Sequence, residues 1–198
     1  MTSFNPPQEY DNVSVLFADF KGYTQLYTSL SDAEVVRLLD SFYRQVDALT
    51  LRFDVEKIKT NGDQYIATSK MESALFLPQF HPNRGASNLC LFAFAIIGVT
   101  NRLAIEYECD IAIRIGIASG PIIGGMIGLH KPSFDIWGKT VNMAARLEQH
   151  SRANRISVCT LTARLLSHQQ SGFEPGPEIL LCNQYKAYEL RKTHQNFV

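Results

Sequence analysis

The sequence has no excess of either charge. Lysine and arginine together number 19, aspartate and glutamate together also number 19, and the formal net charge is zero. Proteins that bind nucleic acid or a membrane surface through general electrostatics normally carry a basic excess. The composition therefore argues against a nucleic-acid partner and against a membrane-surface binder.

The cysteines and the N-terminus also lack the patterns that would indicate an exported protein. No two cysteines have the spacing of a zinc site or of a disulfide framework; they are Cys90, Cys109, Cys159 and Cys182. Residues 1–7 have neither the basic nor the apolar region of a signal peptide. The longest strongly apolar stretch, Leu89–Val99, is too short to span a bilayer and predicts a buried helix. We therefore expect a cytoplasmic protein with no membrane segment.

With 198 residues the chain is long enough for one domain with a proper core. A capping box, Ser31 to Glu34, predicts the start of a long helix. After a loop of residues 71–85 we expect a helix over 87–108, then one ending near Gln149 and a short one over 161–166. Strands are expected at 13–18, 55–60, 64–69, 111–117, 122–127, around Asp135 and at 156–158, with edge strands at 179–182 and 185–190. A turn at Ser119-Gly120-Pro121 separates two of them. This mixture of hairpins and helices predicts an α+β sandwich rather than a doubly wound sheet.

Two aspartates stand where a strand exposes a carboxylate. Asp19 closes the apolar strand of residues 13–18, and Asp63 follows Asn61-Gly62, a dipeptide typical of a tight hairpin turn. If the two strands are neighbours, both carboxylates can meet the same divalent ions, as in metal-assisted phosphoryl or nucleotidyl transfer. Each aspartate alone is more often ordinary turn chemistry.

A third segment favours the functional interpretation. Residues 130–146 combine an aromatic strand, a glycine turn and a helix that carries Asn142 and Arg146. Together, the strings FADFKGYT, EKIKTNGDQYIA and FDIWGKTVNMAAR resemble the class III nucleotide cyclase catalytic domain, the adenylate and guanylate cyclase family. The resemblance implies a ferredoxin-like core with a mostly antiparallel sheet. It covers residues 13–190 as the catalytic domain, between an N-terminal lead of residues 1–12 and a tail of residues 191–198.

The resemblance implies that Asp19 and Asp63 hold two divalent cations, Mg²⁺ or Mn²⁺, with the Phe20 backbone carbonyl as a further ligand. Oxygen ligands suit both ions. The backbone of the segment after Asp19 would cradle the β- and γ-phosphates of a nucleotide, and its residues are Phe20, Lys21, Gly22, Tyr23 and Thr24. An ordinary strand-to-helix turn is the alternative interpretation of this segment.

The family pattern assigns base selection to Lys59 and Asp135. Members specific for guanine tend to carry Glu in place of Lys59 and a small or thiol residue in place of Asp135, so this chain is similar to the adenylate cyclases. The alternative is that Lys59 is a solvated strand residue and Asp135 a structural partner of Trp137. Asn142 and Arg146, four residues apart on one helix face, would orient the ribose and stabilise negative charge in the transition state.

The implied activity is conversion of ATP into 3′,5′-cyclic AMP, a signalling nucleotide, by a head-to-tail homodimer. Asp19 and Asp63 of one copy would work with Lys59, Asp135, Asn142 and Arg146 of the other. Alternatives are a cyclase for GTP or a pyrimidine nucleotide, or a catalytically silent dimerising or nucleotide-sensing module. The family's C-terminal phosphate-binding lysine is not recognisable, and Lys186, His130 or Lys131 are candidates to replace it. Because almost nothing precedes the first strand, we expect no sensor domain, and regulation from elsewhere or an excised catalytic domain.

Overall fold

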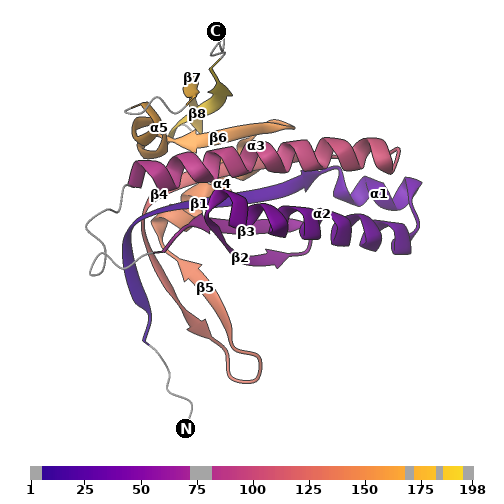
Figure 1. Ribbon diagram of the computed structural model, residues 1–198, viewed down its shortest axis with the longest axis horizontal. Helices are drawn as coiled ribbons and strands as arrows, with labels where there is room; N and C mark the ends of the chain where they lie inside the picture. The colour runs from indigo at the N-terminus through magenta and orange to yellow at the C-terminus, as the bar shows by residue number, and fades with distance from the viewer. Residues whose placement is uncertain (1–5, 72–81, 168–171, 182–184, 194–198) are drawn as a thin grey trace.

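A computed structural model describes residues 6–71, 82–167, 172–181 and 185–193. Along the chain they form β1 (Gln8–Lys21), α1 (Tyr23–Ser29), α2 (Asp32–Phe53), β2 (Val55–Asn61), β3 (Gln64–Ser69), α3 (Pro82–Glu106), β4 (Ala112–Ile127), β5 (Ser133–Trp137), α4 (Lys139–His150), β6 (Arg155–Cys159), α5 (Thr160–Ser167), β7 (Phe173–Leu181) and β8 (Tyr185–Lys192). The strands form one sheet in the order β2-β3-β1-β4-β6-β8-β7, and β5 pairs with β4 (Figure 1). Among these pairs only β4–β6 is parallel, so the predicted α+β fold with a mostly antiparallel sheet is confirmed.

Strand β1 is apolar on both of its faces, and helices cover both faces of the sheet around it. Alternate residues of β1 enter two different cores: Leu16 and Ala18 join the core beneath α2 and α3, whereas Val15 and Phe17 join the core beneath α4. A strand buried on both faces reads as a continuous apolar run, and residues 13–18 are all buried. The candidate site residues described below come from the end of β1, the β2–β3 hairpin, β5 and α4.

The start of α2 and the β2–β3 hairpin follow the sequence patterns closely. Ser31 and Glu34 form the expected capping box, with the Ser31 amide 2.9 Å from Glu34 Oε2. Asn61 pairs with Gln64 at the end of the hairpin, so the two turn residues are Gly62 and Asp63 rather than Asn61 and Gly62. Gly62 has φ 62, a left-handed conformation that costs glycine little, and this single glycine therefore presents Asp63 at the tip.

The predicted turn at Ser119-Gly120-Pro121 is wrong, because β4 runs through it without a break. The register with β1 shifts here, from Gly120 opposite Val13 to Ile122 opposite Tyr10. Pro121 lies at this irregularity, where its lack of an amide hydrogen breaks no regular ladder hydrogen bond. A Cβ on Gly120 would lie 2.7 Å from Thr140 Oγ1. The glycine and proline accommodate a bulge and the close approach of α4, and they do not reverse the chain.

Other boundaries and the place of one strand in the sheet also differ from the expectations. β1 begins at Gln8 rather than at Val13. α3 begins at Pro82 rather than near Ser87, so the end of the expected loop is helical; residues 72–81 of that loop and Cys182 lie outside the described residues. Proline is well tolerated in a first helical turn, where its missing amide has no helical partner. β8 lies between β6 and β7 and is therefore not an edge strand.

Helix α3 is longer than its apolar stretch suggested. By length and composition alone, Arg84–Glu106 could cross a membrane, a criterion that core helices of globular proteins also meet. In this fold Leu89, Phe92 and Ile96 are completely buried in the core shared with α2 and the sheet. The three described cysteines, Cys90, Cys109 and Cys159, carry free thiols.

Candidate active site

The two predicted metal ligands are Asp19, at the end of β1, and Asp63, at the tip of the β2–β3 hairpin. They are close enough for their charges to interact. β3 pairs with β1, which places the hairpin beside the strand that carries Asp19. Burial raises the pKa of the Asp63 carboxyl above its usual value, and the negative charge of Asp19 raises it further; the backbone amides of Asp63 and Phe20 and the charge of Arg114 act in the opposite direction. The two carboxylates thus form a partly buried, mutually repelling pair that a cation stabilises.

An arginine that sequence reasoning missed lies against this pair. Arg114 stands opposite Asp19 in the β1–β4 ladder, and its Nη2 lies 2.7 Å from Asp19 Oδ2. The same Nη2 lies 3.0 Å from Oε1 of Glu148, which α4 presents from above the sheet. Glu148 is only 2 % exposed, so one guanidinium nitrogen is shared between a metal-ligand candidate and a buried carboxylate.

The Glu148 carboxyl lies in an environment that disfavours its charge. Burial raises its pKa to about 7, with further increases from the charges of Asp19 and Asp63 and a decrease from Arg114. Within the described part of the chain, Arg114 Nε and Glu148 Oε1 are buried without a hydrogen-bond partner. The ion pair between them is therefore close but incompletely hydrogen-bonded.

The donor set fits hard divalent cations. Asp19 and Asp63 offer carboxylate oxygens, which Mg²⁺ and Mn²⁺ prefer, and the cluster already attracts a positive charge, that of Arg114. Over the described ranges, no group of three or more His, Cys, Asp or Glu side chains converges as a metal cage. Mg²⁺ commonly uses one or two carboxylates and takes its remaining ligands from water and substrate phosphates. Two aspartates and a backbone carbonyl are therefore a sufficient protein contribution.

The segment after Asp19 turns sharply into α1. Gly22 has φ 91, and a Cβ there would lie 3.2 Å from the Asp110 carbonyl oxygen, so both conformation and space favour glycine. Phe20 packs its ring 4.7 Å from that of Phe42 in the core, which leaves only its backbone for ligand contacts. Lys21 and Thr24 are exposed. The Tyr23 hydroxyl is 2.9 Å from that of Tyr27, and this hydrogen bond is the main reason that its pKa rises to about 12.

Lys59 and Asp135, which are 76 positions apart in sequence, are in direct contact. Lys59 Nζ lies 2.6 Å from Asp135 Oδ2, and Asp135 Oδ1 accepts the Ile136 amide at 2.9 Å. Lys59 is thus paired rather than merely solvated, and its partner is on β5, outside its own hairpin. Their role in base selection stays a prediction.

Asn142 and Arg146 lie on the exposed face of α4. The opposite face buries Ala144, Leu147 and Glu148 against the sheet. With Lys139, Met143 and Tyr185, the two residues line a cavity of about 380 Å³, and Arg146 Cζ lies 5.3 Å from the centre of the Tyr185 ring. The helix therefore directs these two side chains away from Asp19 of the same chain.

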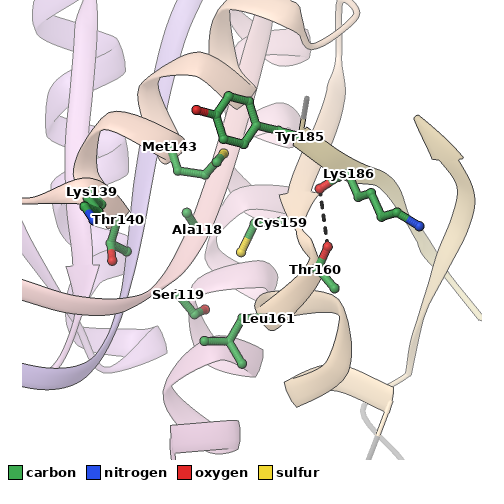
Figure 2. Close-up of a pocket in the computed structure, with 10 residues that line it drawn as sticks. All are labelled: Ala118, Ser119, Lys139, Thr140, Met143, Cys159, Thr160, Leu161, Tyr185 and Lys186. Carbon is green, nitrogen blue, oxygen red and sulfur yellow. Dashed lines mark hydrogen bonds between the residues drawn. The ribbon is translucent and has the colours of Figure 1, made fainter. Parts of the chain in front are cut away.

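A neighbouring cavity of about 390 Å³ is shown in Figure 2, and Lys139, Met143 and Tyr185 line both cavities. Lys186 borders it through its backbone, but its ammonium points away from the other lining residues and pairs with Glu178 on β7 at 3.1 Å. His130 and Lys131 are exposed in the connection between β4 and β5. These placements leave the lysine that would bind the phosphates unassigned.

The sequence around Arg114 and around Glu148 indicates that each is a charged residue in an apolar setting. In Ile111-Ala112-Ile113-Arg114-Ile115, a charged residue occupies the face opposite the buried isoleucines, so it needs a specific partner. Glu148 directly follows Leu147 on the apolar side of its helix. Neither signal names the partner, because the three residues Asp19, Arg114 and Glu148 come from distant parts of the chain.

Comparison with known proteins places these motifs in a family. A family model described as the adenylate and guanylate cyclase catalytic domain matches residues 5–191. An adenylate cyclase of Mycobacterium bovis is 34% identical over 150 residues, which cover 76% of this chain and 32% of that protein. Retinal guanylyl cyclase 1 of Rattus norvegicus is 32% identical over 170 residues, covering 85% of this chain and 15% of that protein. The chain thus spans about a third or less of the length of these curated relatives.

Solved structures agree with this similarity. The guanylate cyclase domain of RhGC from Catenaria anguillulae, in complex with GTP, superposes with a TM-score of 0.79 at 26% identity and covers 94% of this chain and 99% of its own. A guanylyl cyclase domain of the RhoGC fusion protein from Blastocladiella emersonii, described as a non-canonical dimer, gives a TM-score of 0.78 at 28% identity, covering 94% of this chain and 97% of its own.

Proposed function

The chain belongs to the adenylate and guanylate cyclase catalytic domain family, and from that premise we propose that it converts ATP into 3′,5′-cyclic AMP and pyrophosphate. The ribose 3′-hydroxyl loses its proton and attacks the α-phosphorus, and the bond to the pyrophosphate oxygen breaks. The relatives include cyclases for both purine nucleotides, so the choice of ATP rests on this chain's own residues.

The contact between Lys59 and Asp135 carries the choice of adenine. The pair offers an ammonium donor and a carboxylate acceptor side by side, 2.6 Å apart, with Asp135 fixed by the Ile136 amide. The adenine edge presents a ring-nitrogen acceptor next to an amino donor, which these two groups can satisfy together. The resemblance to the family supports the same choice, because its guanine-specific members tend to carry Glu in place of Lys59.

The other site residues would divide the work of binding and charge stabilisation. Asp19 and Asp63 would hold the divalent cations, which when bound lower the pKa of the attacking hydroxyl and neutralise phosphate charge. The backbone amides from Phe20 to Thr24 would bind the β- and γ-phosphates at the strand-to-helix turn that Gly22 permits. Asn142 would orient the ribose. The Arg146 guanidinium would stabilise the negative charge that grows on the α-phosphate.

A homodimer would bring the two halves of this site together. Asn142 and Arg146 face away from the sheet on α4, whereas Glu148 on its other face lies beside Asp19 and Arg114. A second copy, packed head to tail, would supply the missing half to each site. The hairpin of β4 and β5, which projects from the body in Figure 1, exposes several large apolar side chains that a second copy could cover; they are Ile123, Met126, Ile127, Leu129 and Trp137. One structural neighbour is described as a non-canonical dimer, so the proposed head-to-tail arrangement rests on the exposed residues of this chain.

The test is to incubate the purified protein with ATP, GTP, CTP or UTP and Mg²⁺ or Mn²⁺, and to identify the products by mass. Cyclic AMP that disappears in Asp63→Ala would support the reaction and the base choice together. Cyclic GMP or a cyclic pyrimidine nucleotide would keep the reaction but contradict the argument from Lys59 and Asp135. No product with any nucleotide or metal would favour a silent dimerising or nucleotide-sensing module.

A further inference from the structure

Arg114 holds one of the two carboxylate oxygens of Asp19, a candidate metal ligand. Its Nη2 lies 2.7 Å from Asp19 Oδ2, and both side chains are mostly shielded from solvent, at 27% and 19% exposure. A charge-assisted hydrogen bond in this environment is stronger than one at the surface. A cation that binds Asp19 through this oxygen therefore competes with the Arg114 guanidinium.

Glu148 offers Arg114 an alternative partner within reach. Glu148 Oε1 is 3.0 Å from the same Nη2, yet this oxygen and Arg114 Nε are buried and lack hydrogen-bond partners among the residues that the structure describes. Buried polar atoms without partners are costly. A small rotation of the guanidinium toward Glu148 would allow a two-bond pairing through Nε and Nη2 and would satisfy both atoms at once, since a guanidinium fork matches a carboxylate.

We propose that Glu148 is a positioning residue for metal binding: it takes over Arg114 from Asp19 when Asp19 and Asp63 bind divalent cations. Arg114 is then the resting counter-ion of Asp19, and Glu148 lowers the cost of its displacement. This inference rests on the metal assignment of the proposed function, but it requires neither a nucleotide nor turnover.

The experiment measures Mn²⁺ binding to the nucleotide-free protein by the electron paramagnetic resonance signal of free Mn²⁺. In Glu148→Gln, which keeps the size of the side chain, Arg114 has no carboxylate to receive it, and we expect about tenfold weaker Mn²⁺ binding. In Arg114→Met the competing hydrogen bond to Asp19 no longer has to be broken, and we expect about tenfold tighter binding. The double variant Arg114→Met/Glu148→Gln should match Arg114→Met, because Glu148 acts only through Arg114.

The matched control is Glu189→Gln. Glu189 is also a buried glutamate paired with an arginine, Arg152, but it lies on β8 rather than beside Asp19. Its loss should leave Mn²⁺ affinity unchanged even if it lowers stability, which thermal unfolding of each variant records. A general structural effect of removing a buried Glu–Arg pair would weaken binding in both.

Three outcomes would overturn the proposal. The first is unchanged Mn²⁺ affinity in Glu148→Gln, and the second is weaker or absent binding in Arg114→Met. The third is a double variant that binds much more weakly than Arg114→Met, which would make Glu148 itself a metal ligand. Product analysis with ATP and GTP is separate: normal Mn²⁺ behaviour without a cyclic nucleotide would contradict the proposed function and leave this inference intact.

Discussion

The two faces of α4 have opposite surroundings. One face buries Ala144, Leu147 and Glu148 on β4, so closely that a Cβ on Gly116 would lie 2.2 Å from the Glu148 amide nitrogen. The other face exposes Asn142 and Arg146 beside an open cavity, where the Arg146 guanidinium lies over the Tyr185 ring. The buried face is closed and paired within the chain, and the exposed face is available to a partner.

This difference separates two kinds of candidate site residue. On the buried face, Glu148 pairs with Arg114, which also pairs with Asp19 of the same chain. Residues of the exposed face are directed toward the space that a second copy or a ligand would fill. A helix that buries one side and presents the other can thus serve two active sites of a symmetric dimer at once.

The largest expected effect comes from the metal side of this comparison. Asp63→Ala removes one of two candidate carboxylate ligands, and we expect cyclase activity to fall at least about 10³-fold, because charge stabilisation is a large part of such catalysis. Product formation measured by mass spectrometry checks this. The control is Asp40→Ala, an exposed carboxylate paired with Arg44 on α2, which should keep nearly full activity. Equal loss in both variants would disprove the assignment of Asp63.

The second prediction is that the exposed face of α4 contributes to the active site of the partner subunit in a dimer. Asp19→Ala and Arg146→Ala should each be nearly inactive, with Arg146→Ala reduced about 10²–10³-fold. After exchange of subunits, half of the dimers are mixed and each mixed dimer has one of its two sites complete, so roughly a quarter of wild-type activity should return. A mixture that stays as inactive as its components would rule out the shared site.

A third prediction concerns the contact between the buried face of α4 and strand β4. Gly116→Ala places a methyl group against the α4 backbone, 2.2 Å from the Glu148 nitrogen and 2.3 Å from the Ala144 oxygen, and should destabilise the fold by about 3 kcal/mol. The control is Gly98→Ala in α3, where a Cβ meets nothing within 4 Å; it should stabilise by about 0.5–1 kcal/mol through helix propensity. Urea denaturation measures both changes.

The fourth prediction uses the raised pKa of Glu148, which lies near 7 in the folded protein against 4.5 as its ordinary value. As the pH rises, the unfolded state loses this proton first. The stabilisation of the fold by the protonated Glu148 carboxyl is therefore complete below pH 4.5 and is lost by about pH 7. Over that window the metal-free wild type should lose about 3 kcal/mol more stability than Glu148→Gln. Asp63, also with a raised pKa, contributes the same sign in both proteins. Parallel urea-denaturation curves at every pH would contradict the assignment.

The smallest expected effect concerns base selection. Lys59→Met removes the donor of the Lys59–Asp135 pair, and the ratio of cyclic AMP to cyclic GMP formation should fall about tenfold, since an unmatched polar group in a site is costly. Competition between ATP and GTP in one reaction gives this ratio directly. Lys57→Met is the matched control: Lys57 is on the same strand but pairs with Asp47 of α2 at 2.7 Å, so the ratio should not change.

Much of the fold and several site positions could be predicted from local patterns. The capping box placed the start of α2, and the apolar run of residues 13–18 predicted a strand buried on both faces. The dipeptide Asn61-Gly62 predicts a turn, and Gly62 is in the turn, although the turn lies one residue later than this pattern indicates. Such features depend on neighbouring residues in the chain, and their periodicity and backbone preferences are visible in a single sequence.

Gly120-Pro121 predicts a turn, whereas the structure has a continuous strand there, for a physical reason. Glycine and proline favour turns when nothing else acts on them, but here Thr140 Oγ1 donates to the Pro121 carbonyl at 2.7 Å and packs against the bare Cα of Gly120. A residue of α4 thus decides the conformation of β4, and that contact is invisible to a local reading.

By itself, the sequence determined the family, the order of most elements and the residues that carry the metal, base and charge-stabilising predictions, because all of these lie in short contiguous strings. Only the tertiary structure decided that Arg114 joins Asp19 to Glu148, that Lys59 pairs with Asp135, and that Asn142 and Arg146 face outward. Those outcomes depend on which strands and helices pack together across the chain. The free energy of such contacts comes from burial and pairing between distant residues, which no local pattern encodes.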